Sequence, residues 1–377
     1  MAEPLRLLRL ISRLNLGGPA LQIRALTPLL ARRDTHSLIV HGAPGPGEAE
    51  CEGLPPLLSL DQALQLGPRA RGRVLLPGLG PGQSPRQSYQ ALRRLRRLCA
   101  AFAPQVLHSH TAKAGLLAPL CAPKGTAIVH SFHGHVLRDY FGPVRSRALL
   151  LLERRLQRRR ALSTCVSESC GAELEELGIA PIQVIPPTVA LPSPLPRAQA
   201  RRALGLPEDA RLVLFLGRLV PIKDPALFLE TVALFSSREK TPTIPVLLGD
   251  GPLLSQLRDR HPEARFLGPV PEAGRYLRAF DALLLTSKRE GLPLAALEAL
   301  MQGLPVLGPA VPGIRDLQSM GVLPCERRAE GLAEGLGRVR PPTESQIQTL
   351  RQRHDPERMA SIWAEIYREL REQGPRR

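Results

Sequence analysis

The sequence has few aromatic residues and almost no asparagine. Phe, Trp and Tyr make up 3% of its 377 residues, and Asn15 is the single asparagine. Binders of single-stranded nucleic acid stack bases on aromatic side chains, so this scarcity counts against that class of protein. No apolar run approaches the ~18–20 residues that cross a bilayer. Arginines interrupt the N-terminal stretch MAEPLRLLRLISRLN. It therefore does not resemble a signal peptide, and we expect a cytoplasmic protein.

Closely spaced cysteines are also missing. The six cysteines are scattered along the chain and form no CxxC pair. Zinc sites and secreted disulfide frameworks both use cysteines in close spacing, so neither is expected here. Small buried side chains in a reducing compartment are the interpretation that fits this distribution.

Acidic residues are scarce in the first half of the chain. Residues 1–190 contain 24 Lys and Arg against 12 Asp and Glu, whereas the remainder contains 27 against 22. A basic half attracts an anionic partner, such as a membrane surface, a nucleic acid or a phosphorylated substrate. GC-rich coding, which enriches Arg, Pro, Gly and Leu together, would produce the same bias. The sequence leaves both explanations open.

Short apolar runs alternate with amphipathic segments through most of the chain. This alternation is typical of parallel α/β folds, and 377 residues are more than one ordinary core can use. In the first half we expect strands at 5–11, 37–42, 105–110, 127–132, 161–166 and 182–187, and helices near 20–32, 86–102, 112–121, 143–160 and 168–177. The Pro/Gly-rich stretch from 43 to 83 has no clear pattern.

A proline-rich segment at 189–210 interrupts the alternation and is expected to be a linker running into a short helix. The pattern restarts with strands at 211–217, 244–249, 264–268, 282–287 and 304–308, helices at 224–237, 252–260, 271–279 and 293–302, and a last amphipathic stretch at 343–371. We therefore predict an N-terminal Rossmann-like domain (1–190), a linker (191–210) and a C-terminal Rossmann-like domain (211–358). Two such doubly wound domains would face a cleft.

Two glycines follow the first expected strand. Gly17 and Gly18 precede a helix, where backbone N–H groups can approach a phosphate. The spacing is not GxGxxG, and a plain tight turn is the commoner explanation for such a pair.

His133 stands just past the end of a strand, in SFHGH. His108, His110, His130 and His135 are near it in sequence, but no Cys or carboxylate joins them at the spacing of metal ligands. Strand alternation places His108 and His110 on one face of a sheet. We favour a hydrogen bond from His133 to a ligand over a metal site, and a structural histidine stays open.

Two cations follow the strand at 211–217. In FLGRLVPIKD, Arg218 and Lys223 lie on either side of a short turn before a helix. Both can meet a diphosphate, the arginine bidentately and the lysine as a point charge. The alternative is a pair of solvated cations, which suits Lys223 better than Arg218.

Two glutamates lie in TSKREGLPLAALEALMQG. Glu290 stands before the expected helix, Pro293 occupies its first turn, and Glu298 lies inside it among Ala, Leu and Met. Carboxylates can accept hydrogen bonds from hydroxyls, while the free N–H groups of a helix start can hold phosphate. A sugar nucleotide carries hydroxyls at its two ends and negatively charged phosphates in its middle, which matches two carboxylates with a helix start between them. A solvent-facing Glu298 is the alternative, which its apolar neighbours disfavour.

Taken together, these residues resemble the retaining glycosyltransferases of the GT-B fold, specifically glycosyltransferase family 4. The likeness rests on RLNLGGPA, HSHTAKAGLLAPL, HSFHGHVLRDYFGP, VSES, FLGRLVPIKD, LLGDGP and TSKREGLPLAALEALMQGLPV. The last of these corresponds to the family's E-x7-E motif and is the most specific. SIWAEIYREL is similar to the family's last helix, so the resemblance implies that 359–377 crosses back onto the N-terminal domain.

The resemblance also implies roles for individual residues. The C-terminal domain would bind the nucleotide-sugar donor. Arg218 and Lys223 would stabilise the leaving diphosphate by electrostatic catalysis. Glu298 would hold the ribose hydroxyls and Glu290 the sugar ring. Contacts to the donor are implied for a further set of residues, namely Gly17, Gly18, Val270, Gly291, Leu292 and Pro293. His133 would contact the sugar beside the reacting carbon.

The implied reaction moves a sugar from a nucleotide donor, a UDP-sugar by expectation, to a glycan or a polyprenyl- or lipid-linked acceptor with retention at the anomeric carbon. There is no DxD pair, so neither a metal nor a cofactor is implied. LRRLRRLC and ERRLQRRRAL favour peripheral contact with the inner face of the cytoplasmic membrane.

Thr188 and Arg289 depart from the family pattern at the domain junction and in the E-x7-E turn. A sugar-nucleotide 2-epimerase of the same fold, or a non-catalytic polyanion-binding protein, are the alternatives. The sugar, the acceptor, the linkage and the oligomeric state are not determined by the sequence.

Overall fold

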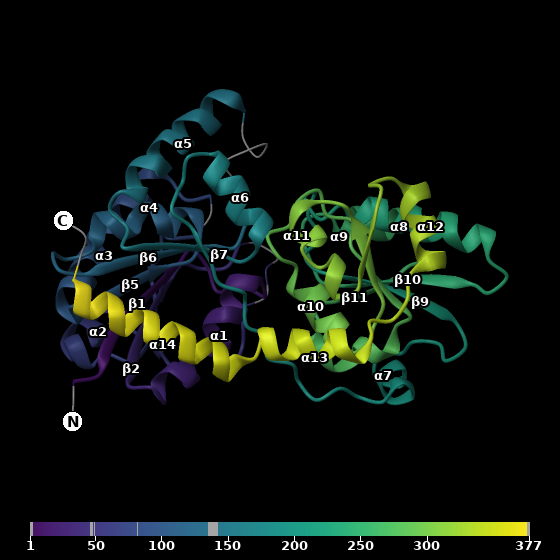
Figure 1. Ribbon diagram of the computed structural model, residues 1–377, viewed down its shortest axis with the longest axis horizontal. Helices are drawn as coiled ribbons and strands as arrows, with labels where there is room; N and C mark the ends of the chain where they lie inside the picture. Colours follow the sequence, from purple (N-terminus) through teal and green to yellow (C-terminus); the bar gives the residue numbers. More distant parts are fainter. Residues whose placement is uncertain (1–2, 46–47, 49, 81, 135–141, 375–377) are drawn as a thin grey trace. The chain divides into compact units, whose positions relative to one another are not determined.

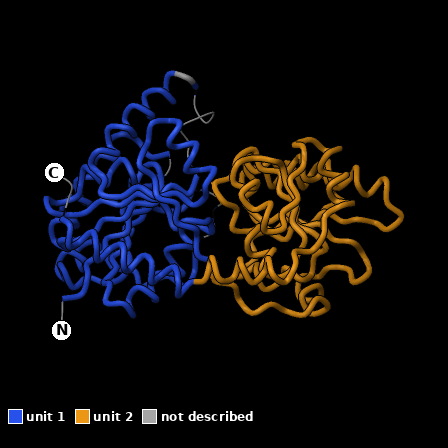
Figure 2. The backbone as a smooth tube through the Cα atoms, viewed as in Figure 1, with its two compact units in different colours: residues 1–188, 356–377 blue, residues 189–355 orange. Residues whose placement is uncertain are grey.

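The computed structural model describes residues 3–45, 48, 50–80, 82–134 and 142–374. Its chain divides into two compact units (Figure 2). Unit 1 comprises Met1–Thr188 with Pro356–Arg377, and unit 2 comprises Val189–Asp355. His135, one of the histidines weighed above, lies outside the described residues, as does part of the HSFHGHVLRDYFGP motif.

Unit 1 is built on an eight-stranded, all-parallel sheet of order β3-β4-β2-β1-β5-β6-β7-β8. Its strands are β1 (Leu5–Ile11), β2 (Thr35–His41), β3 (Leu57–Leu58), β4 (Gly72–Leu75), β5 (Val106–Ser109), β6 (Ala127–Phe132), β7 (Leu162–Cys165) and β8 (Gln183–Val184). Its helices are α1 (Gly18–Ala31), α2 (Leu60–Leu66), α3 (Pro85–Phe102), α4 (Ala112–Cys121), α5 (Pro143–Gln157), α6 (Glu168–Glu176) and α14 (Pro356–Gln373), with a 3-10 turn η1 (Gly67–Arg69).

The two faces of this sheet are covered by different helices. Leu5 and Leu7 of β1 share one cluster with Trp363 of α14, and α1 packs beside α14 (Figure 1). Leu8 and Leu10 point to the other face, where α3 and α4 cover them. Burial on both faces explains why β1 is a nearly continuous apolar run. The return of α14 to unit 1 confirms the prediction that the last helix crosses back.

Unit 2 carries a six-stranded parallel sheet of order β11-β10-β9-β12-β13-β14. Its strands are β9 (Arg211–Leu216), β10 (Thr243–Leu248), β11 (Arg265–Gly268), β12 (Ala282–Leu284), β13 (Val306–Pro309) and β14 (Val322–Cys325). Its helices are α7 (Arg197–Ala203), α8 (Pro225–Arg238), α9 (Leu254–Arg260), α10 (Leu294–Met301), α11 (Pro312–Arg315), α12 (Ala329–Arg338) and α13 (Glu344–Arg353), with 3-10 turns η2 (Ala273–Ala279) and η3 (Gln318–Met320).

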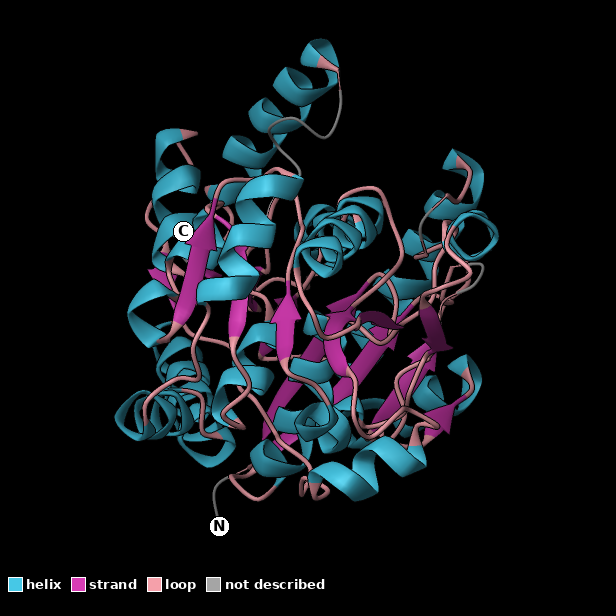
Figure 3. Ribbon diagram, turned by 90° about the vertical axis from the view of Figure 1, so that its right-hand side faces the viewer, coloured by secondary structure: helices cyan, strands magenta, loops and turns pink. Residues whose placement is uncertain are grey.

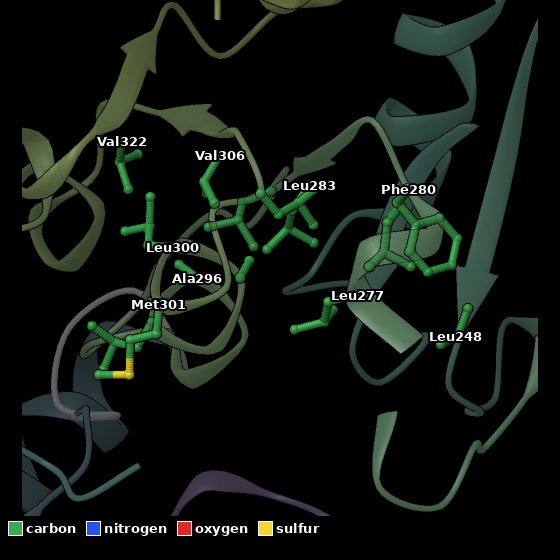
Figure 4. Close-up of a cluster of buried hydrophobic side chains, with 14 of the residues drawn as sticks. Leu248, Leu277, Phe280, Leu283, Ala296, Leu300, Met301, Val306 and Val322 are labelled. Atoms are coloured by element: carbon green, nitrogen blue, oxygen red, sulfur yellow. The ribbon is translucent and has the colours of Figure 1, made fainter. Parts of the chain in front are cut away.

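The core of unit 2 lies on both sides of its sheet, between strands and flanking helices (Figure 3). Figure 4 shows one of its two large clusters, in which Leu283 and Val306 of neighbouring strands meet Ala296, Leu300 and Met301 of α10. The apolar face of α10 is therefore buried in the core.

The observed elements follow the predicted alternation, with several differences, among them that the helix expected at 271–279 is the 3-10 turn η2 and that α11 and η3 were not predicted. The patternless stretch 43–83 holds β3, α2 and β4, and α2 begins at a capping box formed by Ser59 and Gln62. The stretch 343–371 is two helices, because Pro356 lacks an N–H and begins a new helix. The pair β14 and α12 had no counterpart in the prediction.

Two predictions from composition can be compared with the structure directly. All six cysteines are buried, as predicted for small core side chains. Among the described helices, none combines the length and the apolar character needed to cross a membrane.

Candidate active site

The turn after β9 brings two predicted cations next to a second loop. The backbone N–H of Leu219 donates to the carbonyl of Asp250 at 2.9 Å, so the loops after β9 and β10 lie side by side. A Cβ at Gly249 would lie 2.0 Å from the Gly217 carbonyl oxygen. Only glycine allows this approach, which explains the LLGDGP motif. Arg218, half-buried, follows Gly217 in this turn.

Lys223 and Glu290 form an ion pair. Nζ of Lys223 lies 2.5 Å from Oε1 of Glu290, and the Ser287 hydroxyl donates to the same oxygen at 2.6 Å. The Glu290 side chain is only 9% exposed and that of Lys223 28%. The Thr286 hydroxyl donates to the carbonyl of Lys223 at 2.9 Å, which ties the two turns together again. The sequence placed these residues in separate roles; the structure makes them partners.

A second ion pair supports the same turn. Asp224, the residue after Lys223, adopts a left-handed backbone with φ of 50° at the start of α8. Its carboxylate pairs with the guanidinium of Arg327, which follows β14. Arg327 was not predicted, because it lies 103 residues away in a segment without a motif. Only the order of strands in the sheet brings it to this edge.

The E-x7-E segment begins α10 close to another turn. Pro293 is the N-cap of α10, and Glu298 is half-buried within the helix. A Cβ at Gly313 would lie 2.3 Å from the carbonyl oxygen of Gly291, so α11 starts against this turn. Leu292 and Val270 pack on the same core cluster as α10. Of the residues predicted for unit 2, the structure joins Lys223 to Glu290 directly, whereas Glu298 lies within α10.

In unit 1, Gly17 and Gly18 begin α1. Gly17 is the N-cap, and its N–H donates to the Asn15 carbonyl at 2.7 Å. A Cβ on Gly17 would lie 3.2 Å from Oδ1 of Asn15, whose side chain is buried in this turn. Among the described residues no side chain caps this helix end.

The histidines of unit 1 do not form one cluster. His108 and His110 lie on the sheet face beneath α1 and α14, as strand alternation predicted. His130 points to the opposite face, where its Nδ1 lies 2.9 Å from the Ser109 hydroxyl. No group of three metal-binding side chains occurs within the described ranges.

His133 is half-buried at the carboxyl end of β6, and its Nε2 lies 3.3 Å from Nδ1 of His110. Burial lowers the pKa of His133 to about 4 and that of His110 well below its ordinary value. Both imidazoles are therefore neutral at pH 7. A neutral His133 can donate and accept a hydrogen bond without adding charge.

A chain of buried hydrogen bonds ties α14 to three strands. The Tyr367 hydroxyl lies 2.7 Å from Nδ1 of His108, whose Nε2 lies 2.8 Å from the Ser131 hydroxyl. Ser131 in turn lies 2.7 Å from the hydroxyl of Thr164. The sequence did not reveal this chain, because its members come from four separate segments.

Family models match both halves of the chain. The model described as Glycosyltransferase Family 4 matches residues 16–191, and the model described as Glycosyl transferases group 1 matches residues 210–339. The protein belongs to the GT-B glycosyltransferases of the family 4 and group 1 type. The two parallel sheets and the returning helix of this family member agree with that fold.

Curated relatives match parts of this family member. A D-inositol 3-phosphate glycosyltransferase from Thermobispora bispora is 34% identical over 184 residues, which are 43% of this chain and 42% of the relative. A UDP-Gal:alpha-D-GlcNAc-diphosphoundecaprenol alpha-1,3-galactosyltransferase from Escherichia coli is 29% identical over 223 residues, 54% of this chain and 57% of the relative. The matched segments thus span about half the length of these relatives.

Solved structures agree over nearly the whole chain. A sucrose-phosphate synthase from Thermosynechococcus elongatus superposes with a TM-score of 0.75 at 18% identity, covering 97% of this chain and 99% of its own. HepE from Anabaena, in complex with UDP and glucose, superposes with a TM-score of 0.74 at 17% identity, covering 97% and 100%. At these identities the likeness establishes the GT-B fold.

Proposed function

We propose that the protein transfers a sugar from a nucleotide-sugar donor, a UDP-sugar, to a glycan or lipid-linked acceptor, with retention at the anomeric carbon and without a metal ion. The observation that carries the proposal is the Lys223–Glu290 ion pair of 2.5 Å. It joins the two motifs that the sequence singled out independently, at the edge of the sheet where α/β proteins bind ligands.

The charges of this edge suit a sugar diphosphate. In the proposed reaction the bond between the anomeric carbon and the diphosphate oxygen breaks, and the diphosphate leaves with the electron pair. Arg218 and Lys223 stabilise the negative charge that develops there. The acceptor hydroxyl forms the new bond on the same face, and its proton passes to a phosphate oxygen of the leaving group. No protein base is required by this route.

The remaining predicted residues take binding roles. Glu298 accepts hydrogen bonds from the ribose hydroxyls, Glu290 from the sugar, and the backbone N–H groups of Gly291 and Leu292 donate to phosphate. From unit 1 we assign the amides of Gly17 and Gly18 to phosphate and the neutral His133 to a sugar hydroxyl. The absence of a cofactor is part of the proposal.

The names of relatives support the choice of substrates. The Escherichia coli relative is named for UDP-Gal and a diphosphoundecaprenol acceptor, and HepE was solved with UDP and glucose. These names favour a UDP-sugar as donor and a polyprenyl-linked sugar as one class of acceptor. Polysaccharide or glycolipid synthesis would use such a reaction.

Product analysis tests the proposal. The purified chain is incubated with UDP-sugars and candidate acceptors in the presence of EDTA, and the anomeric configuration of the product is read by proton NMR. We expect a glycoside with the configuration of the donor and undiminished rate in EDTA. Inversion at the anomeric carbon would contradict the proposed retention. Loss of activity in EDTA would contradict the proposed independence from metal ions. A 2-epimer formed from donor alone would favour the epimerase.

We also propose that helices α3 and α5 touch an anionic membrane surface. The exposed side of α3 carries Arg86, Arg93, Arg94, Arg96 and Arg97, and α5 exposes Arg145, Arg147, Arg154 and Arg155. Between those arginines α5 exposes Leu151 and Leu152, which are 65% and 42% accessible. Basic side chains beside exposed leucines are typical of helices that lie at a lipid interface. The location implied is the inner face of the cytoplasmic membrane.

Vesicle flotation tests this contact. We expect binding to vesicles of phosphatidylglycerol but not of phosphatidylcholine at low salt, with loss in Leu151→Glu/Leu152→Glu. Leu66→Glu, at a similarly exposed leucine of α2, serves as the control and should bind as wild type. Equal binding by both variants, or none by wild type, would remove the proposed contact.

A further inference from the structure

Arg9 is an arginine at the centre of a sheet. It lies on β1 opposite His108 of β5 and is completely buried. Its Nη1 donates to the Ile23 carbonyl at 3.3 Å and to the Thr27 hydroxyl at 3.2 Å, both on α1. Burying a guanidinium costs free energy unless a counter-charge or a full set of hydrogen bonds compensates it.

The remaining donors of Arg9 have no partner among the described residues. Both Nε and Nη2 are buried without a hydrogen bond. Arg9 does act on Tyr367, because its positive charge and a hydrogen bond to the Tyr367 hydroxyl both oppose the rise that burial causes in the pKa of that hydroxyl. None of the ion pairs among the described residues includes Arg9. One positive charge is thus left uncompensated inside unit 1.

Arg9 borders a small cavity of about 20 Å³ inside unit 1. Such a volume holds about one water molecule or one ion of similar size. Its polar side chains are those of Arg9, Gln22, His108, His110, Ser131, His133 and Thr164. Nε2 of His110 is a second buried atom without a partner among the described residues. Unpaired N–H groups of a guanidinium and an unpaired imidazole nitrogen therefore border the same space.

The histidines around the cavity do not change its charge. Burial lowers the pKa of His108 and His110 well below the ordinary value, so each ring is neutral at pH 7. They neither repel an anion nor neutralise Arg9. The side chain of Gln22 is already engaged, because its amide pairs with the backbone N–H and carbonyl of Thr188 at 2.7 Å each.

We propose that this cavity binds a small inorganic monoanion of the size of chloride, held by the guanidinium of Arg9 and the Nε2–H of His110. The anion supplies the counter-charge that the protein does not provide. It also selects a tautomer: with Nε2 of His110 donating to the anion, Nδ1 must accept from the Nε2–H of His133. The Nδ1 of His133 is then a hydrogen-bond acceptor. The anion thereby orients His133, a residue of the proposed active site. The anion site itself can exist whether or not the protein is a transferase.

Crystals of the wild-type protein test the site directly. They are soaked in sodium bromide, and anomalous differences are recorded at the bromine edge. We expect a bromide peak within hydrogen-bond distance of Arg9 and His110. Bromide peaks on the surface without a peak at Arg9, or a water molecule in its place, would overturn the proposal.

Thermal unfolding in two salts tests it in solution. Chloride should raise the Tm of the wild-type chain by about 2–4 °C over gluconate at equal ionic strength, because gluconate is too large for the cavity. Arg9→Met removes the charge at similar length and should abolish the difference. Arg6→Met, at an arginine of the same strand that is bound to Glu3 near the surface, should retain it.

Each alternative result has a meaning. Equal Tm values of the wild-type chain in both salts overturn the proposal. A chloride effect that persists in Arg9→Met overturns the assignment to Arg9. If Arg9→Met does not fold, the bromide peak in wild-type crystals decides.

Discussion

The two units place charged and polar groups in opposite ways. At the edge of the unit 2 sheet the cations meet carboxylates, as in the Lys223–Glu290 and Arg327–Asp224 pairs. Around the cavity of unit 1 the described polar residues are neutral histidines, hydroxyls and Gln22, together with the charge of Arg9; the buried Arg160–Glu153 pair of unit 1 does not line this cavity. Paired charges near solvent can be redistributed when a charged ligand arrives, whereas a buried neutral network is rigid and costly to disturb. The first arrangement suits binding and the second suits support.

The largest expected effect concerns the unit 2 ion pair. Lys223→Met should lower kcat by about 10²–10³-fold, because charge stabilisation of a leaving group is a dominant contribution. Glu290→Gln should cause a loss of similar size, because it removes the carboxylate that holds Lys223 and contacts the sugar. Because the two residues contact each other, the double variant should lose less than the product of the single losses. Steady-state kinetics on purified variants measures this.

Lys288→Met is the matched control, since this exposed lysine lies in the same turn as Glu290. It should retain wild-type turnover. Full activity in Lys223→Met would show that the Lys223–Glu290 pair is structural. The polar groups described in both units would then serve as support.

The second prediction concerns pH and unit 1. His108, His110, His130 and His133 all have a lowered pKa in the folded state, first because of burial. The unfolded chain therefore binds more protons than the folded one below about pH 6.5. The contribution of these neutral rings to stability is complete above that pH and is lost as the pH falls toward the lowered values, by at most about 1.4 kcal/mol per pH unit for each ring.

Trp363 makes this measurable, because it is the only tryptophan and is buried in unit 1 beside His108. Urea unfolding followed by its fluorescence should show a lower midpoint at pH 5.5 than at pH 7.5. A midpoint that does not change would show that the buried histidines are protonated without cost.

The third prediction removes one link of the hydrogen-bond chain. Tyr367→Phe leaves Nδ1 of His108 without its partner in a buried site, which should cost about 1–3 kcal/mol in the free energy of unfolding. The same urea assay measures it. Tyr89→Phe, at an exposed tyrosine of α3, should have no effect. If Tyr367→Phe leaves the free energy of unfolding unchanged, the chain of hydrogen bonds does not hold α14 in place.

The smallest expected effect concerns Arg327. Arg327→Met breaks the pair with Asp224 and loosens the turn that carries Lys223, so we expect about a tenfold loss of kcat, or roughly 1.4 kcal/mol, with little change in Tm. Arg328→Met is the control, because Arg328 is exposed and pairs only locally with Glu326 and Glu330 among the described residues. If Arg327→Met has the kcat of the wild type, the Arg327–Asp224 pair does not support the active site, and only the Lys223–Glu290 pair remains assigned to it.

Much of the fold followed from local patterns. Strand β1 and helix α4 occupy the ranges expected for them, because each is an apolar run of the length typical of a buried strand or helix. The stretch 43–83 was not predicted, since short strands such as β3, only two residues long, have no periodicity to detect. The helix break at Pro356 was missed although proline is a known signal for it.

The sequence by itself determined the alternation of strands and helices. It also determined which glycines and charged residues stand in the turns that follow the strands. Those features depend on residue order over short distances. Only the tertiary structure decided which side chains meet: Lys223 with Glu290, Asp224 with Arg327, and Arg9 with a cavity rather than a carboxylate. Partners 67 or 103 residues apart are set by the order of strands in the sheet, which local sequence does not encode.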